Sequence, residues 1–100
     1  MFPQRAPSPF ELSVERAVKA IPRGQTLSYA GVALRANKPG AARAAARALH
    51  FLAGLPWWRV IRSDGTLATP VAVEQARRLR DEGVSVRGRR VVRRNARSRK

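Results

Sequence analysis

The sequence contains no cysteine, and this absence excludes several classes of function at once. Without cysteine there is no disulfide framework, no thiolate nucleophile and no thiol ligand for a metal. A single histidine is too little for a zinc site, so we expect no metal and no cofactor. No apolar run approaches the roughly 20 residues that span a bilayer, and the first residues lack the apolar core of a signal peptide. We therefore expect an intracellular protein.

Acidic residues are also scarce: six Asp and Glu stand against 21 Lys and Arg, which gives a formal net charge of +15. No acidic residue lies between Glu15 and Asp64, so the body of the chain is itself basic. This balance is typical of a protein that binds a polyanion. No helix pattern sets large apolar anchors opposite a basic face, as a membrane-surface helix does, so nucleic acid is the favoured partner. We expect a cytoplasmic protein, associated with the nucleoid if its host is bacterial.

One hundred residues support a single domain with a small core. A first helix is predicted over residues 9–20, because Ser8 and Glu11 have the spacing of a capping box and apolar residues then recur at helical spacing. The sequence Pro-Arg-Gly ends this helix with a turn. Residues 26–27 could form a short strand, and the serine that follows caps a second helix over residues 29–36.

A third helix follows the break at residues 37–40 almost at once. The alanine-rich run from Ala41 to about Leu52 has very high helix propensity. At 100° per residue one stripe of alanine and leucine turns inward. The opposite, outward stripe consists of Arg43, Ala46, Arg47 and His50. The pattern predicts helix, short turn, helix, with a small and basic outer face.

The remaining elements predict a wing and one more helix. Residues 58–61 are typical of a strand, residues 62–65 of a tight turn and residues 66–67 of the return arm of a hairpin. A fourth helix is expected over about residues 71–82, and residues 84–86 could pair as an edge strand. The fold class is therefore mainly α with a small β hairpin, a winged helix-turn-helix DNA-binding domain.

The predicted elements divide the chain into three regions. Residues 1–7, with two prolines and little to bury, are expected to be a flexible leader. Residues 8–86 form the winged-helix domain. Residues 87–100, of which eight are cationic and none is acidic, are expected to be a basic disordered tail.

Both tryptophans stand side by side in the sequence Pro56-Trp57-Trp58-Arg59-Val60. Such a pair could consist of two hydrophobic anchors, one in the core and one under a loop. The five residues resemble the active-site strand of the O6-alkylguanine-DNA alkyltransferases, Pro-Cys-His-Arg-Val, in which the cysteine accepts the alkyl group. Tryptophan in the place of that cysteine is the mark of the alkyltransferase-like proteins, which bind alkylated DNA and do not repair it.

Three further segments agree with this resemblance. Residues 21–24, Ile-Pro-Arg-Gly, are similar to the Ile-Pro-x-Gly turn of the family. The pair Ser28-Tyr29 resembles its Ser-Tyr pair, and residues 42–44 resemble the start of its recognition helix. The resemblance extends from about Phe10 to Val86.

The resemblance implies that the third helix enters the minor groove of duplex DNA. Arg43 would take the place of the flipped nucleotide, because a guanidinium plane can stack on the neighbouring bases. A plain phosphate contact is the alternative for this arginine. Tyr29 would help rotate the target phosphate, or would be a half-buried helix tyrosine. The expected DNA-binding residues are Tyr29, Ala42, Arg43, Ala44, Ala46 and Arg47.

The resemblance also implies a lesion pocket formed by Tyr29, Trp57, Arg59 and Val60. Trp57 replaces the acceptor cysteine with a stacking face, so recognition would replace reaction. Its neighbour Trp58 stands where the enzymes carry the histidine that activates the thiol together with a glutamate. That glutamate has a counterpart in Glu82, which we expect to pair with Arg59 because an indole cannot relay a proton.

We therefore expect a non-enzymatic, monomeric protein that recognises O6-alkylguanine in double-stranded DNA, flips the base and flags it for nucleotide excision repair proteins. A first alternative is a general winged-helix DNA-binding protein, architectural or regulatory, with no lesion pocket. A second is residual catalysis by a nucleophile other than cysteine.

Overall fold

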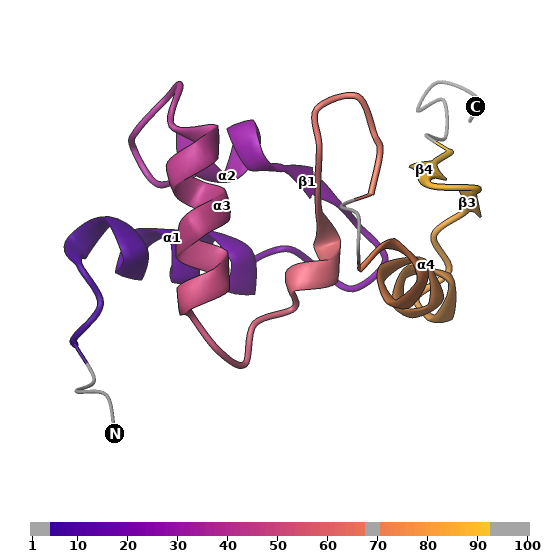
Figure 1. Ribbon diagram of the computed structural model, residues 1–100, viewed down its shortest axis with the longest axis horizontal. Coiled ribbons are helices and arrows are strands. Elements are labelled where there is room, and N and C mark those ends of the chain that lie inside the picture. The colour runs from indigo at the N-terminus through magenta and orange to yellow at the C-terminus, as the bar shows by residue number, and fades with distance from the viewer. Residues whose placement is uncertain (1–4, 68–70, 93–100) are drawn as a thin grey trace.

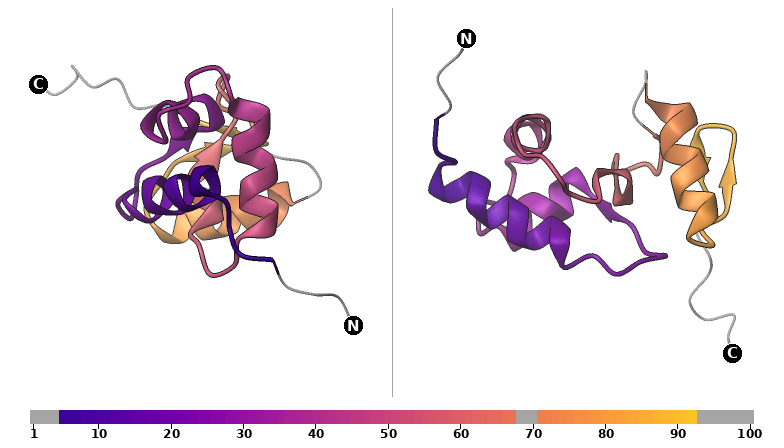
Figure 2. Two further views of the ribbon diagram at one scale, coloured as in Figure 1. Left: turned by 90° about the vertical axis from the view of Figure 1, so that its left-hand side faces the viewer. Right: turned by 90° about the horizontal axis from the view of Figure 1, so that it is seen from below.

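The computed structural model describes residues 5–67 and 71–92. The helices are α1 (Pro9–Lys19), α2 (Tyr29–Arg35), α3 (Ala42–Phe51), the short 3-10 helix η1 (Trp57–Arg59) and α4 (Ala72–Asp81). The strands are β1 (Leu27–Ser28), β2 (Val60–Ile61), β3 (Val86–Arg87) and β4 (Arg90–Val91). Helices α1 to α3 form one lobe, and α4 lies with the β3–β4 hairpin at the other end of the molecule (Figures 1 and 2).

Helix α1 begins with the predicted capping box. Ser8 Oγ accepts a hydrogen bond from the Glu11 backbone N–H at 3.1 Å, and Glu11 Oε1 accepts one from the Ser8 N–H at 2.8 Å. Arg5 donates to both carboxylate oxygens of Glu11 at 2.8 Å, and its guanidinium lies 3.8 Å from the centre of the Phe51 ring. The predicted flexible leader therefore does not include Arg5, which ties the start of α1 to the end of α3. Residues 1–4 lie outside the described ranges.

Helices α2 and α3 form the predicted helix-turn-helix. Ser28 caps α2, since its Oγ accepts a hydrogen bond from the Gly31 N–H at 2.9 Å. At the other end Asn37 adopts a left-handed conformation with a φ of 66°, and the Lys38 N–H donates to the Ala33 carbonyl at 2.9 Å. This is a Schellman motif, and asparagine is one of the few residues other than glycine that adopt its conformation readily.

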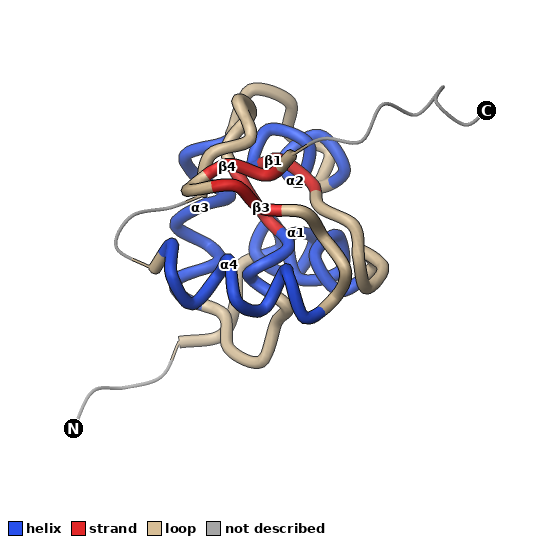
Figure 3. Tube along the Cα trace, turned by 90° about the vertical axis from the view of Figure 1, so that its right-hand side faces the viewer, coloured by secondary structure: helices blue, strands red, loops and turns tan. Residues whose placement is uncertain are grey.

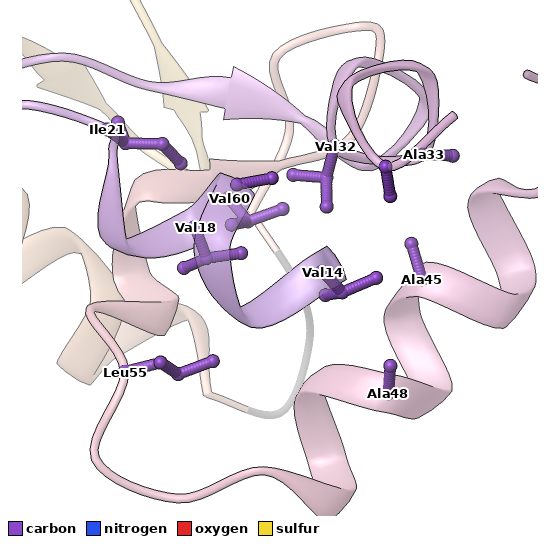
Figure 4. Packing of buried hydrophobic residues seen from close by; sticks show 11 residues of the cluster. Val14, Val18, Ile21, Val32, Ala33, Ala45, Ala48, Leu55 and Val60 are labelled. Atoms are coloured by element: carbon purple, nitrogen blue, oxygen red, sulfur yellow. The ribbon is translucent and has the colours of Figure 1, made fainter. Parts of the chain in front are cut away.

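The main core lies between α1, α2 and α3 (Figure 4). The α3 side chains buried in it are small, the fully buried Ala45 and the nearly buried Ala48, and the half-buried Leu49 packs against its edge. Val14 and Val18 of α1 and Val32 of α2 are also completely buried and pack in the same cluster. Because alanine projects so little, α3 can lie close to its neighbours, and a larger residue at either alanine would overpack this core.

The predicted wing hairpin is formed only next to its turn, where the Gly65 N–H donates to the Arg62 carbonyl at 2.8 Å and the Arg62 N–H donates to the Thr66 carbonyl at 3.1 Å. The outgoing strand is shorter than predicted, because Trp58 and Arg59 belong to the 3-10 turn η1. Strand β2 pairs with β1 in parallel, with Leu27 beside Val60. Both β2 residues are buried, as in an interior parallel strand, so they occupy the inside of the fold rather than one arm of an exposed hairpin.

The return arm of the predicted wing pairs with the C-terminal hairpin instead. Thr66 forms a bridge with Arg90, and the Leu67 N–H donates to the Arg89 carbonyl at 2.7 Å. The chain is therefore ordered beyond Val86, and the disordered tail predicted from Arg87 begins too early. Residues 87–92 are ordered because valines of β3 and β4 pack on a second core cluster around α4. Residues 93–100 lie outside the described ranges.

Helix α4 is confirmed, one residue shorter than predicted at each end. Its buried residues are Ala72, Gln75, Ala76 and Leu79. Gly83, with a φ of 87°, ends the helix, and the Val84 N–H then donates to the Leu79 carbonyl at 2.9 Å. This ending turns the chain back so that β3 can return along the helix.

Candidate nucleic-acid interface

The outer face of α3 is basic and shallow. Arg43 and Arg47 are exposed, and neither forms an ion pair within the described part of the chain. Ala42, Ala44 and Ala46 are half-buried between the two arginines and the core. Two unpaired guanidinium groups on a surface of methyl groups allow close approach of a polyanion to the helix backbone.

A pocket of about 290 Å³ lies beside this face. Helix α3, η1, the start of α2 and the start of α4 supply its walls. The lining residues are Tyr29, Ala46, Leu49, His50, Leu52, Gly54, Leu55, Trp57, Val71 and Gln75. Its walls are mostly aliphatic and aromatic, with a few polar groups, which is the usual composition of a site for a small planar ligand.

Tyr29 is the first residue of α2 and lies half-buried in this pocket. Burial raises the pKa of its phenol, and the positive charge of Arg62 offsets part of that effect. The hydroxyl is therefore protonated at neutral pH and can donate a hydrogen bond to an oxygen of a ligand. A wall that combines this hydroxyl with the Trp57 indole offers both stacking and polar contact.

The two tryptophans are adjacent in sequence, but their side chains lie in different environments. Their rings are 6.0 Å apart at an interplanar angle of 85°, so they meet edge to face. Trp57 lines the pocket, whereas the Trp58 indole N–H donates to Glu82 Oε2 at 2.9 Å. The guanidinium of Arg78 lies 4.6 Å from the centre of the Trp58 ring. Trp58 is thus held by the protein itself, and Trp57 supplies the free stacking face.

Glu82 lies at the centre of a buried polar cluster, with its side chain only 4% exposed. Arg59 Nη2 donates to it at 2.7 Å and Arg59 Nε at 3.0 Å, and the Gly24 N–H donates at 3.1 Å. Arg59 also donates to the Ile21 carbonyl at 2.9 Å. The predicted pairing of Glu82 with Arg59 is confirmed. This cluster joins the turn after α1, the 3-10 turn and the end of α4.

Hydrogen bonding lowers the pKa of Glu82 to about 2, with Arg59 as the largest cause and the Trp58 indole and Gly24 N–H as smaller ones. Burial opposes this shift. The carboxylate is therefore ionised at neutral pH. It accepts hydrogen bonds and has no proton to relay.

Sequence reasoning missed Gln75, which is 1% exposed and lines the pocket. Its Nε2 donates to the Trp58 carbonyl at 3.0 Å and to the Val60 carbonyl at 2.9 Å. These bonds fix the backbone on both sides of Arg59, next to the pocket. The signal was present in the sequence, because Gln75 lies on the same helical stripe as Ala72, Ala76 and Leu79 and is the one amide among apolar residues.

The structure brings together part of the predicted site. Tyr29, Ala46 and Trp57 meet at the pocket, and Arg43 and Arg47 lie on the same helix as Ala46. Arg59 and Val60, which the sequence predicts in the pocket, lie elsewhere. Val60 is fully buried in the main core, and the guanidinium of Arg59 is bound to Glu82. The aliphatic walls from α3 and the loop after it were not predicted.

Residues 9–84 match the family described as 6-O-methylguanine DNA methyltransferase, DNA binding domain, and the chain belongs to this family. The winged helix-turn-helix fold follows from that membership. A DNA base-flipping protein of Escherichia coli (strain K12) is 38% identical over 92 residues, which is 87% of this chain and 65% of the relative. The chain thus spans about two thirds of the length of such relatives.

Solved structures of related proteins resemble this chain in both fold and sequence. S. pombe Atl1 in complex with damaged DNA containing O6-carboxymethylguanine superposes with a TM-score of 0.72 at 33% identity, covering 78% of this chain and 79% of that chain. The O6-methylguanine methyltransferase of Mycobacterium tuberculosis gives a TM-score of 0.67 at 31% identity, covering 78% of this chain and 50% of that chain. This chain differs from a cysteine-dependent methyltransferase in having no cysteine to accept a methyl group.

In the ranges that the structure describes, no helix has the length and apolar character needed to cross a membrane. The same ranges contain no group of three or more metal-ligating side chains of the His, Cys, Asp and Glu types.

Proposed function

We propose that this protein binds double-stranded DNA through the outer face of α3, flips an O6-alkylated guanine out of the base stack and holds it in the pocket beside Trp57. One observation carries the proposal: the pocket opens beside the basic face of α3, and an indole stands where a reacting group would be needed for repair. Binding and base extrusion then take place without chemistry on the base.

Helix α3 supplies the contacts to the duplex. Ala42, Ala44 and Ala46 let its backbone approach the minor groove, and Arg47 binds phosphate oxygens. Arg43, exposed and unpaired on the same helix, enters the base stack in place of the flipped nucleotide. Extrusion is favoured at an alkylated guanine because its base pair is weakened, so less energy is needed to open it.

The pocket holds the flipped base mainly by contact area. The Trp57 indole stacks on the purine, which contributes about 1–3 kcal/mol. The leucine walls surround the alkyl group, and the protonated Tyr29 hydroxyl donates to an oxygen of the base or of its phosphate.

Two relatives support this proposal: one is a DNA base-flipping protein, and another was solved in complex with DNA that contains O6-carboxymethylguanine. We extend it to a monomeric protein acting in the cytoplasm, at the nucleoid in a bacterial cell. The bound lesion is then handed to nucleotide excision repair proteins, since the protein cannot remove the alkyl group itself.

The test compares affinities for two duplexes that differ only in guanine or O6-methylguanine at one position. We expect roughly tenfold or tighter binding to the modified duplex, because stacking on Trp57 adds about 1–3 kcal/mol once the base is flipped. Fluorescence anisotropy at several salt concentrations measures the dissociation constants of both duplexes. Equal affinities would instead support a plain winged-helix DNA-binding protein without a lesion pocket.

Incubation with O6-methylguanine DNA is expected to leave the mass of the protein unchanged and the lesion intact. The chain has no cysteine, and Trp58 replaces the histidine of the related enzymes, so no activated nucleophile faces the base. Intact-protein mass spectrometry and nucleoside analysis of the recovered DNA measure the two results, with a cysteine-containing methyltransferase of the family as the positive control. A gain of one methyl group on any residue, or restored guanine, would contradict the proposal.

A further inference from the structure

The β3–β4 hairpin lies beyond residues 9–84, the part of the chain that matches the family. Backbone and side-chain hydrogen bonds nevertheless attach the hairpin to the domain. The Val91 N–H donates to the Gly65 carbonyl at 2.9 Å, and Arg90 Nη1 donates to the Asp64 carbonyl. Within the hairpin the Val92 N–H donates to the Ser85 carbonyl at 2.8 Å. The hairpin therefore presents its side chains in a set position against the turn at residues 62–66.

The two faces of this hairpin differ in chemistry. Val86 and Val91 are paired across the strands and pack on the core cluster of α4. Arg87 and Arg90 form the next pair and are both exposed. Like charges directly opposite each other destabilise a strand pair, so the exposed face carries a cost that a bound anion would remove.

Acidic residues do not neutralise Arg87. The six acidic residues of the chain all have polar partners elsewhere. Glu11 pairs with Arg5, Glu15 with Lys19, Glu74 with Arg77 and Arg78, Asp81 with Arg77, and Glu82 with Arg59. The remaining one, Asp64, lies closest to the hairpin, and its carboxylate accepts hydrogen bonds from Thr66 N at 3.0 Å and Thr66 Oγ1 at 2.7 Å.

An open depression of about 530 Å³ lies between the hairpin and the turn at residues 62–66. Arg87, Arg90 and Ser63 line it, together with Asp64. Figure 3 shows the turn of the hairpin on the same side of the molecule as α3 and the start of α4. A long anion bound along α3 could therefore continue past the start of α4 to this depression.

From these observations we infer that the β3–β4 hairpin is a second phosphate-binding surface for duplex DNA, centred on Arg87. It extends the contact made by α3 along the sugar-phosphate backbone and carries no base information, because exposed arginines such as Arg87 bind phosphate oxygens whatever the base sequence. This inference rests on the proposed DNA binding by α3 and adds a contact outside residues 9–84. A duplex is the fitting partner because its phosphates are regularly spaced and rigid enough to reach both surfaces.

The test measures binding to undamaged and O6-methylguanine duplexes over a range of salt concentrations for Arg87→Gln and Arg87→Glu. Arg16→Gln is the matched control, because Arg16 is an exposed arginine of α1, a helix in the lobe that does not contain the hairpin (Figure 1). Each variant is also made in a chain that ends at Val92, which removes the five cations of residues 93–100. Thermal unfolding checks that all variants are folded, as expected since Arg87 is exposed.

We expect Arg87→Gln to reduce the log–log salt slope by about 0.9, the value for one lost phosphate contact, in both chain lengths. Affinity should fall several-fold, equally for both duplexes, and further for Arg87→Glu. A slope change no larger than that of Arg16→Gln would overturn the inference. If the unchanged protein shows no preference for the lesion, the proposed lesion recognition fails, while the slope still decides whether the hairpin binds phosphate.

Discussion

Replacing Glu82 with alanine is expected to lower the free energy of unfolding by about 3–5 kcal/mol, the range for breaking one side of a buried ion pair. The change leaves the Arg59 guanidinium, 15% exposed, without its counter-ion. It also leaves the Trp58 indole N–H and the Gly24 N–H without an acceptor. For a domain of this size such a loss is a large part of the total stability. Urea denaturation followed by circular dichroism measures it.

Glu74→Ala is the matched control for this prediction. Glu74 pairs with Arg77 and Arg78, but its side chain is 41% exposed, so solvent screening should make its loss much less destabilising than the loss of Glu82. Equal and small losses for the two variants would show that the Glu82 cluster contributes little to stability.

The contribution of Glu82 to the free energy of unfolding should also depend on pH. Its pKa is lowered to about 2 in the folded protein from an ordinary value of 4.5, so its stabilising contribution is complete above pH 4.5. That contribution is lost as the pH falls from 4.5 towards 2. The difference in unfolding free energy between the unchanged protein and Glu82→Ala should therefore shrink across this window. Glu11, with a pKa also lowered to about 2, is intact in both proteins and cancels from the comparison.

The elements that could be predicted are those with short-range signals. Ser8 with Glu11, Ser28 before α2 and the alanine run of α3 each act within one or two helical turns, and all three predictions are confirmed. The parallel pairing of β1 with β2 could not be found in the same way. It joins segments distant in sequence, and nothing in either pair of residues specifies its partner.

The C-terminal hairpin was missed for a different reason. Its sequence is dominated by arginine, and a run of like charges is typical of a disordered segment. Val86 and Val91 nevertheless alternate with the arginines, so one face can pack on α4. Two half-buried valines and a set of backbone hydrogen bonds order this segment, although its composition alone indicated the opposite.

The candidate site was only partly predictable because the Trp57–Arg59 segment is a 3-10 turn. In an extended strand alternate residues share a face, so Trp57 and Arg59 would point the same way. With three residues per turn, successive side chains instead point about 120° apart. Trp57 therefore faces the pocket, Trp58 faces Arg78, and Arg59 faces Glu82.

Trp57→Ala is expected to reduce affinity for the O6-methylguanine duplex by roughly tenfold or more, through the loss of about 1–3 kcal/mol of stacking. Affinity for undamaged duplex should change little, because in the proposed mechanism Trp57 contacts the base only after it has left the stack. Trp57 is half-buried at the pocket and does not belong to the main core cluster. If it were instead an anchor of the fold, its loss would weaken both duplexes in parallel and lower thermal stability.

Arg43→Ala tests the part of base flipping that takes place in the duplex, where the proposal has Arg43 fill the gap in the base stack. Without the guanidinium nothing fills the gap that the flipped nucleotide leaves, so the extruded state should be less populated. The fluorescence increase of 2-aminopurine at the target position should therefore fall, together with the preference for the lesion.

Arg47→Ala is the matched control, since Arg47 is exposed on the same helix and is assigned only a phosphate contact. It should weaken binding to both duplexes equally and leave the fluorescence change at saturating protein intact. An unaltered signal for Arg43→Ala, together with a parallel loss for Trp57→Ala, would mean that the protein binds DNA without flipping a base.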